Sequence, residues 1–192
     1  MPENRAGPGG RVGGGESPPG AALPIEALAE DARSLTPEAF EARHGSGFLM
    51  VSAAGGRASK GSTSTHLYLE GEDGDPGART ANLAVVVYPL QPKASSDEHL
   101  VTIGRETRHD VVIPDPSVSR FHAFAKSVGD GTFLLQDMGS TNGTSVNGVS
   151  VPPRGAGPPT SVKPGDTVRV GQVEFTFTDA RALHEFALQV GG

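Results

Sequence analysis

The spacing of hydrophobic residues changes from a helical to a strand-like period partway along the chain. Apolar residues from Ile25 to Ala32 recur three and four positions apart, which predicts a helix over about 24–34. Thr36-Pro37-Glu38 is typical of an N-cap, a first-turn proline and a first-turn acid, so a second helix is expected over 37–44, ended by Gly45. Helices this short are marginal alone, so we expect both to pack on another part of the chain.

Short β-type runs separated by turn signals follow the two helical segments. Three are predicted as strands before Pro92, at 48–52, 65–70 and 81–90. Beyond Pro92, seven more runs alternate with tight-turn sequences: HLVTIG, DVVI, FHAFAKS, TFLLQD, TSVNGVSV, TVRVGQ and VEFTFT. Many short strands with frequent turns predict an all-β fold, either an antiparallel β-sandwich or a barrel. A last amphipathic segment, 180–190, predicts a C-terminal helix.

Composition and charge restrict what this domain does. The 192 residues include 27 Gly and 16 Pro, and residues 1–22 contain almost nothing apolar, which predicts a disordered tail beside one packed domain. A net charge of −6 argues against a general nucleic-acid binder. The chain has no cysteine, no signal-peptide pattern and no run of 18 apolar residues, so we expect a cytoplasmic protein without membrane attachment.

Three loop stretches carry polar groups next to predicted strand ends. Gly104-Arg105 puts a long cation at a loop mouth, although taken alone it is an ordinary surface arginine. Ser119, Arg120 and His122 lie at a strand entrance, where the histidine is most simply a structural residue that hydrogen-bonds loop backbone. The stretch DMGSTNGTSVNG, residues 137–148, by itself indicates only hairpin turns, because Asn-Gly tolerates positive φ.

In combination these motifs resemble the forkhead-associated (FHA) domain. The resemblance rests on Gly104-Arg105, Ser119-Arg120-Phe121-His122, 139–144, Asn147-Gly148 and the turn KPGDTVRVG at 163–171, in that order. It implies an FHA-type antiparallel β-sandwich of eleven strands that binds phosphothreonine in partner proteins. The expected organisation is a disordered Gly/Pro-rich tail (1–22), an extension with two short helices and one or two strands (23–80), the FHA domain (81–178) and a C-terminal helix (179–192).

The resemblance also implies a role for each motif residue. Arg105 would bind phosphate oxygens with its planar guanidinium, and the Ser119 hydroxyl would donate to another oxygen. Thr141 would contribute its hydroxyl or backbone N–H, while the Asn142 amide would hold the peptide main chain. The expected phosphopeptide-binding residues are Arg105, Ser119, Arg120, Thr141 and Asn142, and the expected structural supports are Gly104, His122, Gly143 and Asn147.

The expected function is therefore recruitment of phosphorylated proteins in Ser/Thr kinase signalling. The partner would contain phosphothreonine and would be a Ser/Thr kinase or its substrate, with no cofactor, nucleic acid or membrane involved. The alternative is an FHA-like assembly module that binds an unphosphorylated partner. Catalysis is not expected, because no Walker loop or Gly-x-Ser-x-Gly elbow occurs, HEFAL lacks a second zinc-helix histidine, and the six histidines form no cluster in the sequence.

The extension leaves two hypotheses open. Its apolar residues, including Phe40, Phe48 and Leu49, need burial, so it either docks on the sandwich or is recruited elsewhere. Thr36-Pro37 and the Ser/Thr run at 62–65 are also candidate phosphorylation sites, which this same domain would bind in cis or between chains.

Overall fold

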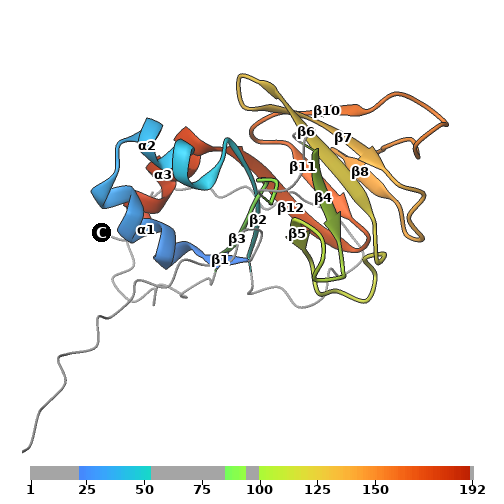
Figure 1. Cartoon of the computed structure of the whole chain (residues 1–192), viewed down its shortest axis with the longest axis horizontal. Helices are drawn as coiled ribbons and strands as arrows, with labels where there is room; N and C mark the ends of the chain where they lie inside the picture. Colours follow the sequence, from blue (N-terminus) through green and yellow to red (C-terminus); the bar gives the residue numbers. More distant parts are fainter. Residues whose placement is uncertain (1–21, 53–84, 94–99, 191–192) are drawn as a thin grey trace, which may run out of the picture.

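The computed structural model describes residues 22–52, 85–93 and 100–190, and Figure 1 shows their arrangement. Several predicted features lie outside these residues: the tail apart from residue 22, the strand at 65–70, the Ser/Thr run at 62–65 and the start of the run at 81–90.

The described strands form two sheets that pack face to face (Figure 1). Seven strands follow the order β1-β3-β2-β12-β11-β8-β9, and five follow the order β10-β7-β6-β4-β5. Every pairing is antiparallel except that of β4 with β5. The predicted all-β sandwich is thereby confirmed, and the barrel alternative is wrong. The strands are β1 (Leu23–Pro24), β2 (Gly47–Ser52), β3 (Val85–Pro89), β4 (Leu100–Gly104), β5 (Val111–Val112), β6 (Ala123–Gly129), β7 (Thr132–Asp137), β8 (Thr144–Val146), β9 (Val149–Ser150), β10 (Thr160–Val162), β11 (Thr167–Val170) and β12 (Val173–Asp179).

Alternate residues of the strands fill the space between the two sheets. Side chains point to opposite faces of a strand in turn, so Phe133 and Leu135 of β7 meet Phe175 and Phe177 of β12 in the core. The rings of Phe133 and Phe177 pack edge to face, with centroids 5.6 Å apart. This core holds the strands rigid, and their connecting loops project from its ends.

Three short helices pack against the outer face of the seven-stranded sheet at its β1-β3-β2-β12 end: α1 (Ile25–Ser34), α2 (Pro37–His44) and α3 (Ala180–Val190). Their positions confirm the predicted short N-terminal helices and C-terminal helix. The Thr36 hydroxyl accepts a hydrogen bond from the Ala39 N–H (3.3 Å) and so caps α2, which ends at Gly45 with φ of 94°.

Strand β2 joins the helical layer to the sandwich. It pairs with β3 on one side and with β12 on the other, so it is an internal strand of its sheet. Phe48 points to the helices and packs near Phe40, while the next residue, Leu49, points into the sandwich core. His184 of α3 donates from Nε2 to the Leu35 carbonyl (3.0 Å), which ties the C-terminal helix to the N-terminal pair.

Candidate functional site

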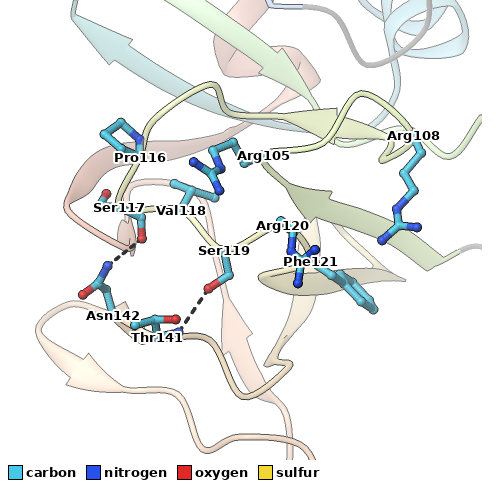
Figure 2. A pocket seen from close by; sticks show the side chains of 10 residues that line it. All are labelled: Arg105, Arg108, Pro116, Ser117, Val118, Ser119, Arg120, Phe121, Thr141 and Asn142. Atoms are coloured by element: carbon cyan, nitrogen blue, oxygen red, sulfur yellow. Dashed lines mark hydrogen bonds between the residues drawn. The ribbon is translucent and has the colours of Figure 1, made fainter.

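A pocket of about 560 Å³ lies among three loops at one end of the sandwich (Figure 2). The loops follow β4, precede β6 and connect β7 to β8. Because loop side chains at the end of a sandwich have no core to fill, they are free to contact a ligand. The pocket is lined by Arg105, Arg108, Pro116, Ser117, Val118, Ser119, Arg120, Phe121, Thr141 and Asn142.

All five predicted binding residues line this one pocket, although up to 37 positions separate them in the sequence. Of the four predicted supports, Gly104, His122 and Gly143 are part of its loops or contact them. Asn147 instead lies in the β8–β9 turn, where its side chain bonds Asp166 (2.8 Å) and the Thr167 N–H (2.9 Å). Asn147 thus ties two turns together and contributes no wall to the pocket.

Two hydrogen bonds join opposite walls of the pocket, and Figure 2 shows both. Ser119 Oγ accepts from the Thr141 backbone N–H (3.1 Å), and Asn142 Nδ2 donates to the Ser117 carbonyl (2.7 Å). The Thr141 N–H is therefore used within the protein, which leaves the Thr141 hydroxyl as that residue's group facing a ligand. Asn142 keeps its Oδ1 and a second N–H, and Ser119 keeps its hydroxyl proton for donation.

Ser117 lines the pocket and also makes hydrogen bonds within the fold that the sequence did not predict. Its Oγ donates to Asp115 (2.5 Å) and accepts from the Gln172 N–H (2.9 Å). The first bond lies within the loop before β6, and the second fastens that loop to the turn between β11 and β12, 55 positions away in the sequence. No local signal in the sequence indicates this pairing.

His122 ties together two of the loops that form the pocket. It is fully buried, its Nδ1 accepts from the Ser119 N–H (3.0 Å), and its Nε2 lies 3.1 Å from the Gly143 carbonyl. This pair of contacts assigns the proton to Nε2, which donates to the carbonyl. Burial lowers the pKa of His122, which favours the neutral ring that this arrangement requires.

Asp137 organises the loop that carries Thr141 and Asn142, and sequence analysis did not identify it. Its carboxylate accepts from the backbone N–H groups of Gly139 and Ser140 (both 2.8 Å) and from the hydroxyls of Ser140 and Thr144 (both 2.6 Å). Burial alone would raise the pKa of Asp137, but these donors outweigh it and lower the pKa. The bonds to residues two and three positions ahead form an Asx turn, a pattern that a closer reading of DMGS would suggest.

Three arginines give the pocket a positive wall. The Arg105 backbone N–H donates to the Ser119 carbonyl (3.1 Å), which fixes where this side chain leaves the sheet. Arg108 and Arg120 both lie near Glu106, with Nε–carboxylate distances of 2.9 and 3.9 Å. Among the lining residues there is no acid, so the site suits an anion.

No group of three or more potential metal ligands occurs in the described part of the chain, and no described helix is long and apolar enough to span a membrane.

Gly104 is required at the base of the Arg105 loop, and alanine is expected to destabilise the fold there by about 1–3 kcal/mol. An added Cβ would lie 2.2 Å from the Arg120 carbonyl oxygen and 2.6 Å from the His109 ring. The carbonyl belongs to the backbone of the opposite loop, so relief of the clash must move that loop. Guanidinium chloride denaturation of Gly104→Ala measures the loss, and stability equal to that of the unsubstituted chain would contradict this packing.

Three histidines with lowered pKa values should make the folded chain less stable in acid. Burial is the main cause that lowers the pKa of His44, His109 and His122. The unfolded chain protonates each ring near its ordinary pKa of about 6.5, whereas the folded chain resists protonation until lower pH, so the unfolded state binds more protons. The free energy of unfolding is therefore expected to be constant from pH 8 to 7 and to fall from about pH 6.5 downward. Denaturation curves at pH 8, 7, 6 and 5 test this, and a rise in stability on acidification would contradict it.

The chain is similar to known FHA proteins. The family model of the FHA domain matches residues 101–171. Over 103 residues the chain is 32% identical to the oxoglutarate dehydrogenase inhibitor of Corynebacterium diphtheriae, a match that covers 52% of this chain and 67% of that protein. Over 80 residues it is 40% identical to angiogenic factor with G patch and FHA domains 1 of Mus musculus, covering 40% of this chain and 11% of the mouse protein. The chain thus spans only a small part of the mouse protein's length.

A solved structure from a structural and functional analysis of phosphothreonine-dependent FHA domain interactions is also similar. The identity is 25% and the TM-score 0.43, and the superposition covers 69% of this chain and 95% of that one.

Proposed function

Since the chain belongs to the forkhead-associated (FHA) family, we propose that its pocket binds a phosphorylated threonine in a partner protein. The observation that carries this proposal is the meeting of Arg105, Ser119 and Thr141 in one pocket free of lining acids. The guanidinium supplies paired N–H donors for phosphate oxygens, and the two hydroxyls supply single donors. Asn142, on the same wall, keeps a donor and an acceptor for the peptide main chain.

The number of contacts is consistent with reversible binding. A phosphothreonine carries about −1.5 to −2 charges and three acceptor oxygens. Four charge-assisted hydrogen bonds at roughly 1.5–3 kcal/mol each give a gross ~6–12 kcal/mol, against an association cost of ~4–15 kcal/mol. The phosphate contacts alone are therefore marginal, and peptide contacts must add to them. A micromolar complex, about −8 kcal/mol, is the expected result.

The test compares one peptide in three forms, with phosphothreonine, threonine or glutamate at the same position. Calorimetric titration of the full chain is expected to give micromolar affinity for the phosphorylated form and at least about 30-fold weaker binding of the others, because they lack the phosphate oxygens. Equal affinity for the three forms would reject phosphate recognition. It would favour the alternative of an assembly module that binds an unphosphorylated partner.

We also place this binding in Ser/Thr kinase signalling in the cytoplasm, with a kinase or its substrate as partner. In support, the chain is free of cysteine, and the curated relatives that it matches include a bacterial protein, the oxoglutarate dehydrogenase inhibitor of Corynebacterium diphtheriae. Since none of the motifs singled out in the sequence is catalytic, the proposed activity is binding alone. Capture of proteins from cells grown with and without a Ser/Thr kinase inhibitor tests this context, because signalling partners should bind only without the inhibitor.

A further inference from the structure

The pocket has more positive charge than the proposed phosphate contacts use. Arg105 lies above the hydrogen-bonded pair Ser119–Thr141 in Figure 2, whereas Arg108 lies at the right of the picture, beyond Arg120. All three arginines line the same pocket, although the whole chain carries a net charge of −6. The positive charge therefore continues along the pocket, away from the proposed phosphate position.

At this second end of the pocket, the carboxylate of Glu106 lies close to both Arg108 and Arg120. One carboxylate oxygen lies 2.9 Å from Arg108 Nε, and the other lies 3.9 Å from Arg120 Nε. The arginine side chains are 71% and 78% exposed, so these ion pairs are surrounded by water. Exposed pairs of this kind are weak, and a carboxylate from another molecule competes with Glu106 at little cost.

Phe121 provides an apolar surface beside these arginines. The residue is 36% exposed, and its ring stacks on His109 with centroids 5.0 Å apart and planes inclined by 22°. The buried histidine holds the phenyl ring in place next to Arg120 along the pocket wall. A side chain with a short aliphatic stem and an anionic end matches this combination of a flat apolar surface and nearby guanidinium groups.

We propose that the segment bound by this pocket carries an acidic side chain in addition to its phosphothreonine, and that this carboxylate binds Arg108 in place of Glu106. The inference rests on the proposed phosphothreonine binding and names the class of partner segment: an acidic phosphopeptide. Glu106 limits the affinity, because it offers Arg108 the same chemical group within the protein. A lysine at the same peptide position meets two guanidinium groups against the single carboxylate of Glu106 and is disfavoured.

The experiment is a peptide library with one fixed phosphothreonine and with Glu, Gln or Lys, in equal amounts, at each flanking position. The full chain is expected to enrich Glu over Gln at one position by about twofold to fivefold, the range of an exposed charge pair, and to deplete Lys there. Arg108→Gln is expected to remove this enrichment, and Glu106→Gln to increase affinity for the Glu peptide by a similar factor. Arg33→Gln, which removes the same charge from the exposed face of α1, is the control and should retain the enrichment.

The outcomes separate this inference from the proposed function. Binding that needs the phosphate but shows no preference for Glu, or a preference that Arg108→Gln leaves unchanged, overturns the acidic-peptide proposal alone. Binding that does not need the phosphate overturns both proposals. Both side chains are solvent-exposed, 36% for Glu106 and 71% for Arg108, so the substitutions should leave the fold intact. Far-UV circular dichroism of each variant checks that the sandwich is formed.

Discussion

Arg105→Ala is expected to weaken binding of a phosphothreonine peptide by at least about 30-fold, which corresponds to ~2 kcal/mol. The substitution removes the bidentate donor that we assign to the phosphate, while Ser119 and Thr141 still offer single hydroxyl donors. Calorimetric titration with the same peptide for both proteins measures the loss. Undiminished affinity in the variant would reject the assignment of this arginine to the phosphate.

Two further variants test whether the lost affinity reflects the geometry of the Arg105 guanidinium or only its charge. Arg105→Lys keeps the charge but not the planar fork, so its affinity should lie between those of the unsubstituted chain and the alanine variant. Arg33→Gln removes one positive charge from the exposed face of α1, outside the pocket, and should leave affinity unchanged. The Arg105 side chain is exposed, so the thermal unfolding midpoint of Arg105→Ala should match that of the unsubstituted chain.

Phe48→Ala is expected to lower the free energy of unfolding by about 3–5 kcal/mol. The Phe48 ring is fully buried between β2 and the helices, and the substitution leaves a cavity beside Phe40. We propose that the helical layer and the sandwich fold as one unit, because β2 pairs within the sheet while Phe48 packs on the helices. Denaturation followed by far-UV and near-UV circular dichroism should give one coincident transition at the lower midpoint.

Val128→Ala serves as the control for this substitution. Val128 lies in β6 with 52% of its surface exposed, so its loss should change stability by no more than about 0.5 kcal/mol. If Phe48→Ala melted the helices in a separate, earlier transition while the sandwich stayed intact, the two layers would be independent. A stable proteolytic fragment beginning near residue 80 would lead to the same conclusion.

The elements that were predictable are those whose signals are local. The apolar face of 180–190 and the Thr36-Pro37 cap each predict a helix from a few neighbouring residues, and α3 and α2 have those bounds. Alternation and turn residues predict short strands in the same way. The place of β2 between β3 and β12 depends instead on pairing between residues far apart, which no local pattern specifies.

In the pocket, too, some features could be predicted from the sequence and others depend on contacts between distant residues. The motifs identified Arg105, Ser119 and Asn142 because a family resemblance relates distant loops that spacing alone does not. The hydrogen bond from Asn142 to the Ser117 carbonyl, and the use of the Thr141 N–H by Ser119, depend on how closely the loops approach. For Asp137 only the Asx turn is local, whereas its burial and its bond from Thr144 depend on how the loop folds.

The internal position of β2 also affects how the nascent chain reaches its native state on the ribosome. β2 ends at Ser52, but its partner β12 begins only at Val173, so the ribosome must make most of the chain before the two meet. At ~5–20 residues per second, the edge of β2 that pairs with β12 waits on the order of ten seconds for its partner. Until β12 is made, β2 therefore keeps one unpaired edge, and an unpaired strand edge is a site at which chains aggregate.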